Sequence, residues 1–86
     1  MEVIMRPSPE ITRRLGEHLE DLHETNQVIE RLEKRIDAQE RRIEQLKIDG
    51  VDIEPAENLR DGMRDSLQEL IKHRALIMLA IVQREP

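Results

Sequence analysis

The sequence predicts an all-α fold: a two-helix antiparallel coiled-coil hairpin that pairs with a second copy to form a four-helix bundle. Charged residues make up 38% of the chain, with Glu, Arg, Leu and Ile prominent, and this composition is typical of long helices. Apolar residues recur at heptad spacing over most of the length. One turn-like sequence, DGVDIEP at 49–55, divides the pattern into two helices.

Composition limits the function classes. The 86 residues suffice for one domain, residues 1–86. Cysteine is absent, which excludes disulfides and thiolate metal sites and fits a cytoplasmic protein. The absence of Phe, Tyr and Trp removes the usual stacking surfaces for single-stranded nucleic acids. A net charge of −5 disfavours nucleic acid and anionic membranes as partners. No stretch has the ~20 apolar residues that cross a bilayer, and the N-terminus lacks the features of a signal peptide.

The first helix is predicted to run from about residue 9 to residue 49. Ser8 can cap it, Pro9 suits the first helical position, and Glu10 favours the positive end of the helix dipole. Gly50 can adopt the left-handed conformation that ends many helices. The predicted turn covers residues 50–54.

The second helix is predicted from about residue 55 to residue 84. Asp52 or Glu54 is the expected cap, and Pro55 falls in the first turn.

Both helices carry a heptad seam, along which residues at positions a and d should pack against the partner helix. In the first helix, position a holds Leu15, Leu22, Ile29, Ile36 and Ile43, and position d holds Ile11, His18, Thr25, Leu32, Gln39 and Leu46. In the second helix, position a holds Met63, Leu70 and Ile77, and position d holds Leu59, Ser66, His73 and Ala80.

A short turn makes the two helices antiparallel neighbours. We expect an alignment that sets Leu32 against Leu70, because nearly every layer then pairs a larger apolar residue with a smaller or polar one. The same alignment places Glu40 beside Arg60, Val28 beside Leu76 and Leu19 beside Ile81 on the flanks. The predicted hairpin core consists of Leu22, Ile29, Leu32, Ile36, Ile43, Leu46, Leu59, Met63, Leu70, His73, Ile77 and Ala80.

The run ALIMLAIV at 75–82 contains more apolar residues than one seam requires. The residues left over form a second stripe on the second helix, and the first helix extends past the end of its partner. A helix with two apolar stripes packs on two sides, so we expect a second chain to cover this surface. The predicted dimer or partner interface consists of Ile11, Leu15, Ile71, Ala75, Met78, Leu79 and Val82.

Two histidine-containing features could carry chemistry. Glu20 and His23 match the Glu-x-x-His signature of di-metal helical bundles, but both fall on the outer face of the predicted seam, so we expect no metal and no cofactor. His18 and His73 fall within the seam, where we interpret them as polar residues that fix the alignment. If His73 is buried and neutral, its protonation below about pH 6 would loosen the bundle.

The chain contains no phosphate-binding Gly-rich loop and no Ser-His-Asp set, so we do not expect an enzyme. The leading hypothesis is a non-enzymatic protein–protein interaction module, a self-associating scaffold, adaptor or chaperone-like hairpin. Its partner would be a second copy of the chain or another protein's helix. The alternative is a small regulatory hairpin dimer that binds nucleic acid through its basic residues. A metal-binding helical bundle is the third hypothesis.

Overall fold

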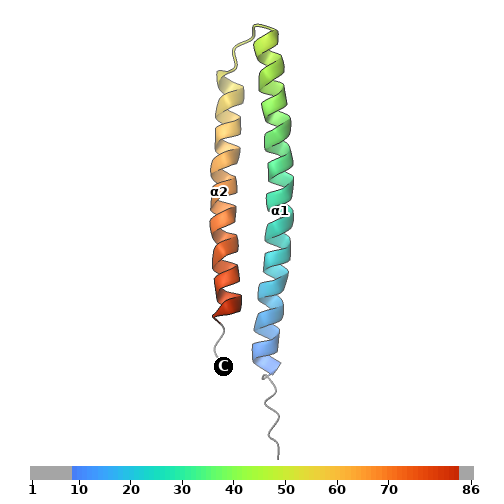
Figure 1. The fold of residues 1–86 in the computed structure, drawn as a ribbon, viewed down its shortest axis with the longest axis vertical. Helices are drawn as coiled ribbons and strands as arrows, with labels where there is room; N and C mark the ends of the chain where they lie inside the picture. The colour runs from blue at the N-terminus through green and yellow to red at the C-terminus, as the bar shows by residue number, and fades with distance from the viewer. Residues whose placement is uncertain (1–8, 84–86) are drawn as a thin grey trace, which may run out of the picture.

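The structure, a computed structural model, describes residues 9–83 and consists of two helices joined by a short turn. Helix α1 spans Pro9–Ile48 and helix α2 spans Glu54–Val82. The helices run antiparallel and side by side, and α1 extends beyond the C-terminal end of α2 (Figure 1). The predicted all-α helical hairpin is therefore confirmed.

The end of α1 is fixed by Gly50, which adopts a φ of 71°. Its N–H donates to the carbonyl oxygen of Lys47 at 3.2 Å, and the N–H of Val51 donates to that of Leu46 at 3.0 Å. These two bonds form a Schellman motif, in which a left-handed residue lets the chain satisfy the last helical carbonyls. The predicted role of Gly50 is confirmed.

The start of α2 differs slightly from the prediction. Ile53 occupies the cap position without a side-chain hydrogen bond, and the helix begins at Glu54. Asp52 contributes by accepting a hydrogen bond from the backbone N–H of Glu54 at 3.1 Å. Pro55 lies in the first turn, as predicted. The predicted end near residue 84 falls outside the described residues.

The seam of α1 follows the predicted heptad. Each position a and d from Leu15 to Leu46 is buried or half-buried. Ile43 is the most deeply buried, with 2% of its surface exposed. The side chain of Ile11 lies outside the described residues. The centre of the core consists of Leu32, Ile36 and Met63, with Leu67 and Leu70 packed against them.

The seam of α2 is rotated relative to the prediction. Met63 and Ile77 are buried as expected, with Leu70 half-buried. However, Leu59 is 54% exposed and His73 is also exposed, so their assignment to the core was wrong. The residue that follows each predicted position d is half-buried and lines the seam in its place. These residues are Arg60, Leu67, Arg74 and Ile81. The predicted core residue Ala80 remains half-buried at the edge of the seam.

Side-chain size explains this rotation. Position a stays in the seam, and a small turn of α2 brings in the residue after each position d. This covers Leu67 in place of Ser66, which removes more apolar surface from water. The cost is that Arg74 enters the seam, but a long arginine can cover apolar surface with its stem while its head group reaches the edge. The guanidinium of Arg74 accordingly donates to the side-chain oxygen of Asn26 at 3.3 Å. With His73 outside the core, the expectation that its protonation loosens the bundle no longer has a basis.

The alignment along the helix axes is close to the predicted one. Glu40 forms its ion pair with Arg64, one helical turn from the expected Arg60. Near the turn, the side-chain amide of Gln39 donates to the carbonyl oxygen of Ala56 at 3.0 Å. The Glu40–Arg64 ion pair and the Arg74–Asn26 hydrogen bond lie on the same side of the hairpin, since Asn26 and Glu40 are two heptads apart on α1. We call this side the Asn26 flank.

Candidate interaction surface

The C-terminal part of α2 exposes a cluster of apolar side chains that the hairpin does not cover. Met78 is 51% exposed and Val82 is 79% exposed. A solvent-exposed apolar surface of this kind on a small chain usually marks a site of contact with another molecule. We call the whole cluster the α2 patch, and it consists of Ile71, Ala75, Met78, Leu79 and Val82, all of them exposed.

The α2 patch lies mainly on the Asn26 flank. Ile71 and Met78 follow Arg64 at heptad intervals, so they project from α2 on the side where Arg64 meets α1. On α1, Leu19 precedes Asn26 by one heptad and is also exposed. The two helices therefore contribute to a shared apolar surface on this flank.

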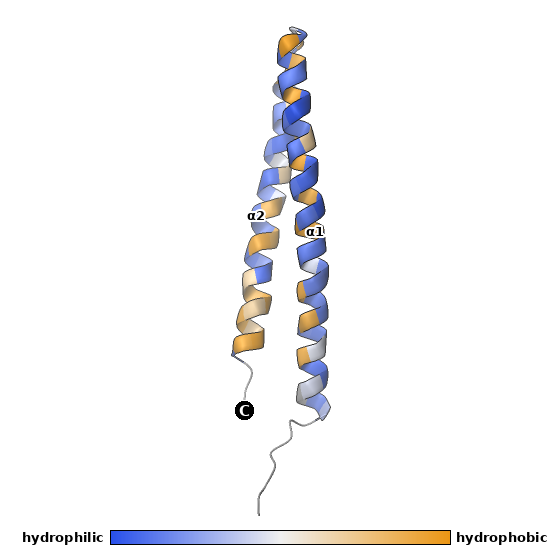
Figure 2. Cartoon of the chain, turned by 45° about the vertical axis from the view of Figure 1, so that its right-hand side comes forward, coloured by the Kyte–Doolittle hydropathy of each residue, from blue (hydrophilic) through white to orange (hydrophobic). Residues whose placement is uncertain are grey.

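The last turns of α2 are apolar on every side. Ile77 faces α1, Met78 lies on the Asn26 flank, and Leu76 is 64% exposed on the other side of the helix. Figure 2 shows the hydrophobic colouring gathered at this end of α2, whereas most of α1 is hydrophilic. A helix that is hydrophobic all round is normally buried, so this segment has the composition of an interior helix with only one side covered.

The predicted interface residues are only partly brought together. The five residues on α2 form one surface, as expected from their spacing. Leu15 is half-buried, and the side chain of Ile11 lies outside the described residues. Leu19 was not among the predicted interface residues, because the predicted alignment set it beside Ile81 on the flank of the hairpin. Its position one residue after seam residue His18 was the signal, because such positions lie at the edge of a coiled coil.

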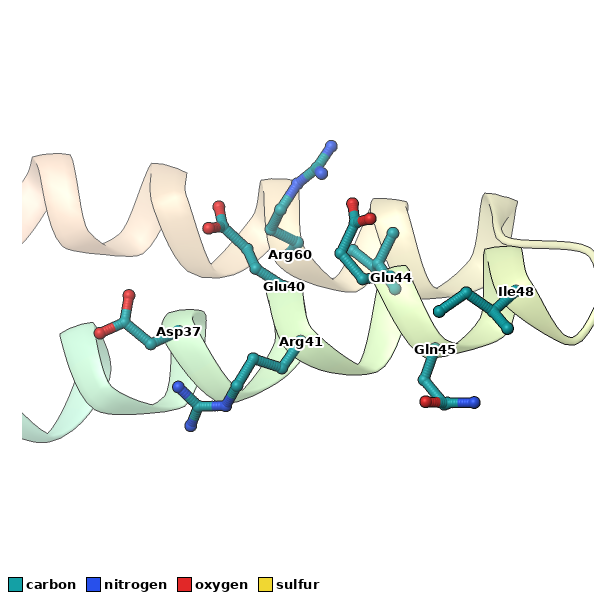
Figure 3. Close-up of a pocket in the computed structure, with 8 residues that line it drawn as sticks. Asp37, Glu40, Arg41, Glu44, Gln45, Ile48 and Arg60 are labelled. Atoms are coloured by element: carbon teal, nitrogen blue, oxygen red, sulfur yellow. The ribbon is translucent and has the colours of Figure 1, made fainter.

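Towards the turn, the Asn26 flank becomes acidic. An open depression of about 600 Å³ lies there and is lined mainly by polar residues of α1. Figure 3 shows the carboxylates of Asp37, Glu40 and Glu44 around it, with Arg60 contributed by α2. Arg60 lies 3.2 Å from Asp61 and 3.7 Å from Glu57. Since this end is lined mainly by charged side chains, an apolar partner on this flank would meet the α2 patch and not the turn.

The two residues of the Glu-x-x-His motif, Glu20 and His23, are both exposed on the surface of α1. Among residues 9–83, no group of three or more His, Asp or Glu side chains is placed to hold a metal ion. In the same part of the chain, neither helix is long and apolar enough to cross a membrane.

The sequence matches no protein-family model, and comparisons with curated proteins and with solved structures find no match either.

Proposed function

We propose that this chain is a non-enzymatic protein–protein interaction module that associates with a second copy through the α2 patch. The observation that supports this is the apolar character of α2 between Ala75 and Val82 on all sides, with only the side facing α1 covered. Because the chain lacks cysteine, we expect the module to work in the cytoplasm.

The strength of this association can be worked out from the exposed side chains. The large ones, Leu19, Ile71, Met78, Leu79 and Val82, are between 41% and 79% exposed. Complete burial of such a side chain contributes about 1.5–3 kcal/mol, so covering the exposed part contributes about 1 kcal/mol each. Two copies together gain about 10 kcal/mol, against an association cost of at least about 4 kcal/mol. The remaining free energy, at most about 6 kcal/mol, corresponds to a dissociation constant of roughly 40 μM or weaker.

The test is the molar mass in solution, measured by light scattering from a few micromolar to about 500 μM, a range that brackets this dissociation constant. At about 1 M NaCl, where exposed ion pairs are screened, we expect the native chain to pass from monomer to dimer. Met78→Glu should then remain monomeric because it places a charge in the contact. Ile48→Glu is the matched control, since Ile48 is an exposed apolar residue beside the turn, and it should dimerise as the native chain does. A native chain that is monomeric throughout would overturn self-association through the patch.

A further inference from the structure

The opposite side of the hairpin carries a second feature, an open groove of about 640 Å³ between the helices. Its floor is apolar, formed by Leu32, Met63 and Leu70 of the core. Its α1 wall carries Val28, Arg31 and Arg35, and its α2 wall carries Leu59, Gly62 and Ser66. We call this side the Val28 flank. Both Val28 and Leu59 are exposed within it.

Charge is segregated along the α1 part of this flank. Asp21 and Glu24 precede Val28 and Arg31 by one heptad each, so they lie on the same side of α1. Moving along α1, the flank therefore presents acidic residues, then Val28, then Arg31 and Arg35. Between Asp21 and Arg35, no acid stands on the arginine side of Val28 and no base on the acidic side along this row.

These charges are not neutralised within the hairpin. Across residues 9–83, Asp21, Glu24, Arg31 and Arg35 make no ion pair with any other described side chain. Arg31 and Arg35 are four residues apart on one helix and Asp21 and Glu24 three apart, spacings at which like charges destabilise a helix. A partner with the reverse charge order would relieve both repulsions.

A second copy of the chain, turned end for end, has that reverse order. Asp21 and Arg35 are each seven residues from Val28, and Glu24 and Arg31 are four and three residues from it. When two α1 helices lie antiparallel with Val28 at the centre, each acid therefore meets an arginine of the other copy. Val28 also lies at the middle of α1 (Pro9–Ile48), so this pairing overlaps the two helices over their whole length.

We propose that the Val28 flank is a self-complementary docking surface for a second copy of this chain, with the two α1 helices antiparallel about a twofold axis near Val28. Such an isologous contact requires a surface that complements itself, and the charge order supplies it. On α2 the same flank offers Gly62 and Ser66, which are small, and nothing lies within 4 Å of a methyl group added at Gly62. Leu76, two heptads after Gly62 and 64% exposed, would be covered by this contact.

This contact is independent of the α2 patch, because the two lie on opposite flanks of the hairpin. They also respond differently to salt. Pairing through Asp21, Glu24, Arg31 and Arg35 should weaken as the salt concentration rises, whereas contact through the α2 patch should not. Salt therefore separates a failure of this inference from a failure of the proposed function.

The first experiment exchanges charges, with Met78→Glu in every chain to remove the α2 patch. Variant one carries Arg31→Glu and Arg35→Glu, and variant two carries Asp21→Arg and Glu24→Arg. Each variant alone carries one sign of charge on this flank between residues 21 and 35 and should be monomeric by sedimentation at low salt. An equimolar mixture should form a dimer. A mixture that remains monomeric, with both variants helical by circular dichroism, would overturn the proposal.

The second experiment maps the axis in the otherwise native chain. Because the chain has no cysteine, Val28→Cys introduces one thiol, which should cross-link to its counterpart through a short bismaleimide at low salt. Lys34→Cys, on the exposed outer surface of α1, is the control and should cross-link at least tenfold less. Equal cross-linking of the two variants would contradict the twofold axis. A salt-sensitive shift of RNA by the native chain that is lost in variant one, together with no cross-link at Val28→Cys, would assign the arginines to nucleic acid instead.

Discussion

The deepest part of the hairpin core can be tested with a matched pair of isoleucines on the same helix. Ile43 is 2% exposed and Ile48 is 77% exposed, so Ile43→Ala and Ile48→Ala remove the same atoms from opposite environments. Truncating a buried isoleucine costs about 2–5 kcal/mol, and we expect about 3 kcal/mol for Ile43 because only one helix covers it. Ile48→Ala should stay within about 0.5 kcal/mol of the native chain.

A loss of about 3 kcal/mol is large for this molecule. At about 0.05–0.15 kcal/mol per residue, 86 residues give a total stability of about 4–13 kcal/mol. The melting temperature of Ile43→Ala should therefore fall by about 12–24 °C. Urea titrations followed by circular dichroism at low micromolar concentration measure the monomer, and the slope of the titration should be unchanged. Equal losses for the two variants would refute the burial pattern of α1.

Three further predictions concern α2, the glycines and the ion pair between the helices. Leu67→Asn should lower the free energy of unfolding by about 2–3 kcal/mol and Leu59→Asn by less than about 0.5 kcal/mol; similar losses in urea would contradict the rotated seam. Gly50→Ala should lower the free energy of unfolding by about 1–2 kcal/mol because of the positive φ at Gly50. Gly16→Ala should raise it by about 0.5–1 kcal/mol because the surroundings of Gly16 are open. Melting temperatures that shift in the same direction for both variants would contradict this prediction. Glu40→Gln should cost less than about 1 kcal/mol at low salt and nothing measurable at about 1 M NaCl, because its ion pair is exposed; a loss that persists in salt would contradict it.

The seam of α1 was predictable because its pattern admits one interpretation. Leu22, Ile29 and Ile36 recur at heptad spacing in a helix that is otherwise mostly charged or polar, so rotating the helix would bury charge and expose isoleucine. The Schellman ending at Gly50 was predictable for a similar reason, since only glycine adopts a φ of 71° without strain.

The seam of α2 was not predictable by the same reasoning. Two adjacent rows of residues on α2 could pack in the seam beside position a. The row of Leu59 and His73 avoids charge, whereas the row of Leu67 and Arg74 buries more apolar surface but includes arginines. The predicted heptad followed the first row, which contains no arginine. In the folded chain, the arginine stem covers the seam while the guanidinium reaches Asn26.

The rotation of α2 also determines which apolar residues were missed. Leu76 was expected beside Val28 within the hairpin and is 64% exposed instead. Leu19 was expected against Ile81 and lies exposed on the Asn26 flank. Both errors follow from the rotation of α2, which moves its flanking residues away from their assigned partners on α1. The α2 patch itself was predictable because the run at 75–82 is apolar on every side of the helix. Wherever the seam lies, apolar residues of this run remain uncovered.

The length of α1 has a consequence for how the molecule moves through water. With 40 residues the helix is about 60 Å long, while a pair of helices is only about 20 Å wide. Such a rod experiences more friction than a sphere of equal mass, so the monomer should elute early from a gel-filtration column. A second rod laid alongside, with Val28 of each at the centre, doubles the mass and adds almost no length. Dimerisation should therefore raise the sedimentation coefficient strongly while the Stokes radius grows only slightly, a hydrodynamic signature of side-by-side pairing.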